Sequence, residues 1–193
     1  MELLAFKDLV TLIQELPGLS SKQSQNLAHY LINNKIHGQK QLDQILQLLD
    51  KIQPCQICTI PSENILCPIC RATGRKKQLL IVENIEQIYQ FERDQIFQGK
   101  YYVIPLLFNK KYEPKPFDFQ FLKEYVHQFD EVILALSLVA EGILTSNLII
   151  DQLRSTSNVL IKQLARGIPW GSKIDYLDPL TLADALKNRK EYD

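Results

Sequence analysis

The spacing of apolar residues predicts three helices in the first quarter of the chain. Apolar side chains recur every three or four positions over residues 2–16, 20–34 and about 40–52, which is the stripe of an amphipathic helix. Pro17 and Gly18 end the first of these helices. Two helices joined by so tight a turn predict a helical hairpin.

Downstream of residue 77, short apolar runs alternate with helical stretches. This alternation predicts a mainly parallel sheet covered on both faces by helices. The expected strands are residues 78–83, 101–104, 131–136 and 158–164, and the expected helices are residues 85–92, 117–129 and 141–155, with a polar loop at 109–116.

The tail of the chain follows a segment interrupted by Gly167, Pro169 and Gly171. It predicts a short strand near residues 174–177 and then a helix that begins at Thr181, with Asp184 as its capping-box partner. Trp170 is expected to serve packing. Together the elements predict an α+β multidomain protein.

Composition and charge limit the classes of function. The chain has 193 residues and is 46% hydrophobic, as in a soluble globular protein, and no apolar run approaches the roughly 20 residues of a membrane span. Its 22 basic and 22 acidic residues cancel, so there is no overall basic signature of nucleic-acid binding. The N-terminus has no basic region before an apolar run, so we expect a reducing, cytoplasmic location.

The four cysteines form two pairs within sixteen residues. Cys55, Cys58, Cys67 and Cys70 have the spacing Cys-x2-Cys-x8-Cys-x2-Cys, which is typical of a tetrahedral zinc site. The segment between the pairs is too short to carry a core, and four sulfur ligands leave no position for a catalytic water. We therefore predict one structural Zn²⁺ per chain. Two disulfides or four free thiols are the alternatives.

The segment around the cysteines is locally positive. Residues 53–77 carry Arg71, Arg75, Lys76 and Lys77 against a single acid, Glu63. A zinc ion with four thiolates is formally dianionic, so these cations either neutralise the metal site or contact DNA phosphates. Both interpretations stay open.

The Pro-Gly turn is similar to a helix-hairpin-helix turn. In such a turn, Gly18, Leu19 and Lys22 would place a helix N-terminus and a cation against a DNA phosphate, independently of base sequence. Ser20 or Ser21 caps the second helix. An ordinary helical hairpin is the alternative.

Two glutamates stand where open α/β sheets place functional groups. Glu83 ends the first expected strand and Glu141 follows the third. They could hold Mg²⁺ for phosphoryl chemistry. Such chemistry normally needs more ligands, and the chain contains no Asp-x-Asp.

The order of these parts resembles the RecR family of bacterial recombination mediators over essentially the whole length. The matching stretches are Leu16-Pro-Gly18 with Lys22, the four cysteines, residues 86–101, Glu131–Ala135, Ala140–Gly142, Leu164–Pro169, and Thr181-Leu182 with Ala185-Leu186.

The resemblance implies four parts and a non-enzymatic function. The parts are a helix-hairpin-helix domain (1–53), a four-cysteine zinc finger (54–73), a Toprim domain (76–170) and a C-terminal segment (171–193) that exchanges between subunits. Four subunits would form a ring around DNA that works with RecO, and with RecF where present, to load RecA onto gapped single strands. Glu83 and Glu141 would lie on the partner-docking face, and the protein would be associated with the nucleoid.

This chain departs from the family pattern at several positions. Ser20 and Ser21 replace a glycine and a proline of the turn, and Asn26 replaces a basic residue, which predicts weaker DNA binding than is usual for the family. Ile143 replaces a glutamate, which removes a possible Mg²⁺ ligand. The alternative functions are a Toprim-type Mg²⁺-dependent nuclease or topoisomerase-like enzyme that uses Glu83 and Glu141, and a zinc module that never contacts DNA.

Overall fold

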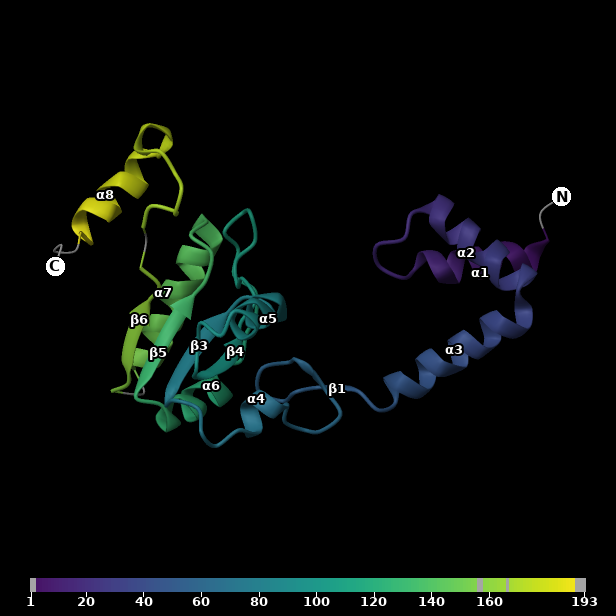
Figure 1. The fold of residues 1–193 in the computed structure, drawn as a ribbon, viewed down its shortest axis with the longest axis horizontal. Helices are drawn as coiled ribbons and strands as arrows, with labels where there is room; N and C mark the ends of the chain where they lie inside the picture. Colours follow the sequence, from purple (N-terminus) through teal and green to yellow (C-terminus); the bar gives the residue numbers. More distant parts are fainter. Residues whose placement is uncertain (1–2, 156–157, 166, 190–193) are drawn as a thin grey trace. The chain divides into compact units, whose positions relative to one another are not determined.

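The structure is a computed structural model that describes residues 3–155, 158–165 and 167–189 (Figure 1). Arg166, in the stretch Leu164–Pro169 that matches the family pattern, lies outside the described residues. The chain divides into two compact units: Met1–Gln53 with Pro61–Asn64, and Pro54–Ile60 with Ile65–Asp193.

The first unit contains the three predicted helices: α1 (Leu4–Gln14), α2 (Ser21–Asn33) and α3 (Lys35–Leu49). Gly18 turns the chain between α1 and α2 with φ +84°, a left-handed conformation that favours glycine. Ser20 caps α2, and its side chain and that of Gln23 form a reciprocal capping box. The helical hairpin is therefore confirmed.

Helix α3 begins five residues earlier than its apolar pattern indicates. Its first turn is polar, but it continues directly from Asn34, whose carbonyl accepts from the Gly38 N–H at 2.8 Å. Gly38 is buried against Leu31, where an added Cβ would lie 2.8 Å from Leu31 Cδ2. A close contact between helices, rather than an apolar stripe, accommodates this first turn.

The second unit is built on a four-stranded sheet with the order β4-β3-β5-β6. All three strand pairs are parallel, as the alternation of elements predicts. The elements are β3 (Gln78–Val82), α5 (Ile85–Arg93), β4 (Lys100–Val103), α6 (Gln120–Tyr125), the 3-10 turn η1 (Val126–Gln128), β5 (Glu131–Ala135), α7 (Ala140–Arg154) and β6 (Leu160–Gln163).

The sheet separates two apolar clusters. Leu79 and Ile81 of β3 point into one, with side chains of α6 and α7, and Leu80 and Val82 point into the other, with α5 and the four cysteines. This follows from the alternation of side chains along a strand. Strand β4 is an edge strand, and α4 (Pro68–Arg71) of the cysteine segment packs beside it.

Three further predictions, for later elements of the chain, are wrong in detail. Residues 117–129 become helical only at Gln120, where Asp118 accepts from the Gln120 N–H at 2.8 Å. The expected strand near 174–177 is the 3-10 turn η2 (Ile174–Tyr176). Helix α8 (Pro179–Lys187) begins before Thr181 because the Asp178 carboxylate caps it and proline suits a first helical position.

Residues 167–189, which include the predicted start of the C-terminal segment at residue 171, expose large apolar side chains. Trp170 is fully exposed in the single chain, and the other exposed members are Ile168, Ile174, Tyr176, Leu180 and Leu186. Within the described residues, Trp170 therefore lacks the packing expected of it. Among the described residues, no helix has both the length and the apolar character needed to cross a bilayer.

Candidate metal centre and nucleic-acid contacts

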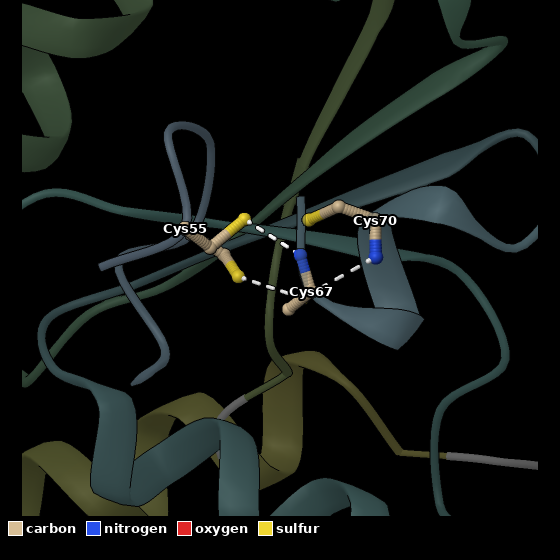
Figure 2. A group of neighbouring side chains, drawn as sticks. Cys55, Cys67 and Cys70 are labelled. Carbon is tan, nitrogen blue, oxygen red and sulfur yellow. Dashed lines mark hydrogen bonds between the residues drawn. The ribbon is translucent and has the colours of Figure 1, made fainter. Parts of the chain in front are cut away.

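The four cysteines converge on one buried point of the second unit. Their sulfur atoms all lie within 4.8 Å of one another, and each side chain is at most 3% exposed. Figure 2 shows two backbone donors aimed at sulfur: the Cys67 N–H reaches Cys55 Sγ and the Cys70 N–H reaches Cys67 Sγ, each at 3.4 Å. Backbone donors of this kind stabilise negatively charged sulfur.

Local backbone geometry brings the two cysteine pairs together. The Cys55 N–H donates to the Ile60 carbonyl at 2.9 Å, and Thr59 takes a positive φ of 58°, so the chain reverses after the first pair. Two short strands, β1 (Gln53–Pro54) and β2 (Pro61–Ser62), flank this reversal. After Cys67, Pro68 starts the single turn of α4 that carries Cys70 inward.

The electrostatics of the cluster favour a cation. A hydrogen bond with Cys70 is the main cause that lowers the pKa of Cys58 to about 6, whereas burial raises the pKa of Cys67 to about 11. Hydrogen bonding to Cys58, burial and the charges of the other cysteines raise the pKa of Cys70. Four neighbouring thiols therefore resist full ionisation unless a metal ion compensates their charge.

The donor set fits a soft, tetrahedral metal ion. Four sulfurs around an ion at about 2.3 Å lie about 3.8 Å apart, and this cluster is close to that size. All four cysteines are free of disulfides, so the disulfide alternative is wrong for this structure. Within the described part of the chain, this is the only group of three or more His, Cys, Asp or Glu residues close enough to share a metal ion.

The hairpin residues lie on the first unit, at the turn before α2. Lys22 and Gly18 are exposed and Leu19 is half-buried. The capping box uses the N–H groups of Ser20 and Gln23 within the protein, at 2.8 and 3.4 Å. Two of the amides at the start of α2 are thus occupied within the protein. The weaker DNA binding expected from the changed turn stays a prediction.

The four cations after the cysteines do not share one environment. Arg71, Lys76 and Lys77 are exposed. Arg75 is half-buried: its guanidinium forms a two-fold ion pair with Glu92 and its Nε donates to the Gly99 carbonyl at 2.6 Å. Arg75 is therefore bound within the second unit, called the sheet unit below, and its guanidinium is engaged inside the protein, unlike the three exposed cations.

Sequence reasoning did not identify the partners of Arg75. Glu92 also accepts from the Tyr101 hydroxyl at 2.7 Å, and the Arg75 guanidinium lies 5.8 Å from the centre of the Tyr101 ring. Burial opposes ionisation of Glu92, but hydrogen bonds from Arg75 and Tyr101 hold its pKa below the ordinary value. These three side chains join the exit of the cysteine segment to α5 and β4.

The two glutamates lie near the carboxyl ends of the strands, as predicted. The Glu83 carboxylate accepts from the Ser137 N–H, so it fixes the loop between β5 and α7. Glu141 is in the first turn of α7, next to Gly142. An added Cβ at Gly142 would lie 2.0 Å from the Ser137 carbonyl oxygen, so only glycine fits this close approach.

The fold and site define a class: an α+β protein with an N-terminal helical hairpin, a buried four-cysteine centre and a parallel sheet. A family model described as "RecR, C-terminal" matches residues 167–190. The chain is 34% identical over 185 residues to "Recombination protein RecR" of Mycoplasmopsis pulmonis, covering 95% of this chain and 96% of that protein.

Proteins with the same name in Thermus thermophilus and Legionella pneumophila are 31% and 35% identical. The alignments cover 94% of both chains for the first and 96% of both chains for the second. The chain belongs to the RecR family. The resemblance stated from the sequence motifs is confirmed, and so is the fold class.

Proposed function

We propose that this protein is a recombination mediator in DNA repair that acts as a scaffold. The observation that carries the proposal is its similarity, over nearly the full length, to proteins named for recombination. In this proposal a ring of four subunits encloses DNA and works with RecO, and with RecF where present, to load RecA onto gapped single strands. A neutral chain fits this function because a ring retains DNA by topology.

Reconstitution tests this function. Purified protein with RecO should accelerate RecA assembly on gapped DNA coated with a single-strand-binding protein, and omission of the protein should abolish the acceleration. No acceleration under any partner combination would refute the proposal. Cleavage of DNA that requires Mg²⁺ and is lost in Glu83→Gln would instead support the nuclease alternative.

The proposed metal is one structural Zn²⁺ held by Cys55, Cys58, Cys67 and Cys70. Burial of all four sulfurs supports a closed site without a coordinated water. Its role is to fold the segment 55–70 and to hold it on the sheet unit. Elemental analysis of the purified protein should give one zinc per chain.

The proposed DNA contacts are phosphate contacts by Gly18, Leu19 and Lys22 of the hairpin and by the exposed Arg71, Lys76 and Lys77. Lys22→Ala should weaken binding to gapped DNA about threefold to tenfold at low salt, because one phosphate contact and its released counterion are lost. The slope of log affinity against log salt should fall by about one unit. Fluorescence anisotropy over a salt series measures both.

The matched control for Lys22 is Lys40→Ala, on α3 of the same unit. Assembly mass and DNA affinity should be unchanged in this control. If Lys22→Ala binds as the wild type does at low salt, the hairpin does not contact DNA. If the wild-type protein binds gapped DNA without salt dependence, or binds none even with RecO, the zinc-module alternative is favoured.

The proposed partner-docking face is the carboxyl edge of the sheet, near Glu83 and Glu141. Leu138, Val139 and Ile143 are exposed at the same edge. Ile143 stands where the family pattern has a glutamate, so RecO contacts here would be more apolar than is usual.

The proposed exchange of the C-terminal segment (171–193) is supported by its exposed apolar side chains and by the exposed Trp170 directly before it. Trp170→Ala should shift the assembly toward smaller species, because the indole would lose its site on a neighbouring subunit. Native mass spectrometry measures the distribution. Tyr112→Ala, in an exposed loop of the sheet unit, is the control and should keep the wild-type mass. Unchanged assembly of Trp170→Ala would contradict the exchange.

A further inference from the structure

Polar side chains of β4 and α6, outside the cysteine segment, lie beside the cysteine cluster. A hollow of about 390 Å³ lies between the cysteine segment and α6. Its lining includes Cys70, Lys100 of β4 and Tyr125 of α6, and the rest of the wall is formed by Ile57, Leu66, Phe121, Glu124 and Gln128. All of these residues belong to the second unit.

Lys100 places its own ammonium group beside the cysteine cluster. Its Nζ donates to the carbonyl oxygen of Cys70 at 2.9 Å, although 30 residues separate the two positions. The exposed Arg71 is adjacent to Cys70 in sequence, but no such contact ties its side chain to the cluster in the described structure. The cation that donates to the backbone of Cys70 therefore belongs to strand β4 and not to the cysteine segment.

Tyr125 is only 5% exposed, and its hydroxyl has no hydrogen-bond partner among the described residues. A buried hydroxyl without a partner costs about 1–3 kcal/mol. Burial is the main cause that raises the pKa of this phenol, so the hydroxyl keeps its proton and can donate. The hollow that it shares with Cys70 has room for bridging water.

We propose that Lys100 and Tyr125 support the metal centre from outside its four ligands, with an ammonium group and a water-bridged phenol that offset the negative charge of the thiolates. Zinc with four thiolates is formally dianionic, and outer groups that donate to the ligands raise metal affinity. Through bridging water, the hydroxyl of Tyr125 can then donate toward the thiolates that surround the ion. Metal binding is thereby coupled to the packing of the finger on β4 and α6.

The inference rests on the zinc centre proposed above, and paired variants test it. Lys100→Met and Tyr125→Phe should each lower zinc affinity about tenfold, as other changes around metal ligands do, in competition with a chromophoric chelator. The controls are Lys110→Met, an exposed lysine of the loop after β4, and Tyr102→Phe, a buried tyrosine of β4 that packs beside Tyr125 in the same apolar cluster. Both controls should bind zinc as the wild type does.

Two further measurements separate this role from general stability. With zinc removed, Tyr125→Phe should unfold at the wild-type temperature or above it, because it loses only an unpartnered hydroxyl. With Co²⁺ in place of zinc, the thiolate charge-transfer bands of both variants should shift, because the donors around the sulfurs have changed.

The outcomes are distinguishable. A wild-type protein that binds no zinc would overturn the metal centre itself. Zinc binding by the wild type, with unchanged affinity and Co²⁺ spectra in Lys100→Met and Tyr125→Phe, would overturn the role of these two residues alone. An equal loss of affinity in Tyr102→Phe would also overturn it, since the effect would then be one of packing.

Discussion

Cys67→Ser should lose zinc and unfold the segment 55–70. Cys67 is fully buried, and its sulfur accepts from the Cys70 N–H while its own N–H donates to Cys55 Sγ. Metal-binding free energy in zinc-finger segments is on the order of 10 kcal/mol or more, and a serine hydroxyl replaces little of it. We expect less than one zinc per chain. Backbone hydrogen exchange should become rapid in this segment before it does so in the rest of the second unit.

The cysteines are buried in the same apolar cluster as Leu80, Val82 and Tyr101. Unfolding the segment would therefore expose one side of the sheet, so reduced solubility should accompany the loss of zinc. Wild-type protein treated with a strong chelator should reproduce the exchange pattern, and Thr73→Ala, an exposed change at the end of the finger, should not. Full zinc content and wild-type stability in Cys67→Ser would refute a structural site.

The clustering of the four cysteines could be predicted because its signal is local. The residue type and the spacing of four ligands can both be read within sixteen residues, and so short a backbone has few ways to bring the sulfurs together. The strands were predictable for a related reason. A strand buried on both faces, such as β3, is a continuous apolar run that differs from the amphipathic helices around it.

The partners of charged residues could not be predicted in this way. Arg75 and Glu92 are 17 positions apart, and only the parallel pairing of β3 with β4 brings α5 and the exit of the finger to the same place. In the sequence Arg75 is one of four similar cations, so we expected it to neutralise the metal or contact DNA. The contact of Lys100 with Cys70, across 30 positions, is hidden for the same reason.

The start of α8 shows a third kind of error. Thr181 has the residue type of a helix cap, but Asp178 offers two carboxylate oxygens and precedes a proline that fits the first turn. Thr181 instead donates its hydroxyl to Asp178 at 2.6 Å. When neighbouring residues can all cap, the local competition decides the boundary and the pattern of apolar residues does not.

Arg75→Met should lower the free energy of unfolding by about 2 kcal/mol while leaving DNA affinity of the folded protein unchanged. Removing one partner of a buried ion pair costs about 3–5 kcal/mol. Arg75 and Glu92 are 18% and 28% exposed, so solvent screening reduces the loss. Denaturant titration measures the change. Arg71→Met is the matched control, because Arg71 is exposed and should lower DNA affinity without affecting stability.

The pH dependence of the same variant distinguishes an ion pair from simple packing. The pKa of Glu92 lies below its ordinary value of 4.5 in the folded protein, so its stabilising effect is complete above about pH 4.5 and is lost as the pH falls through the folded value. The stability difference between wild type and Arg75→Met should therefore narrow below pH 4.5. A stability difference that stays constant to lower pH would show that Arg75 stabilises the end of the cysteine segment by packing alone. A loss of DNA affinity in Arg75→Met equal to that in Arg71→Met would show that Arg75 contacts DNA after all.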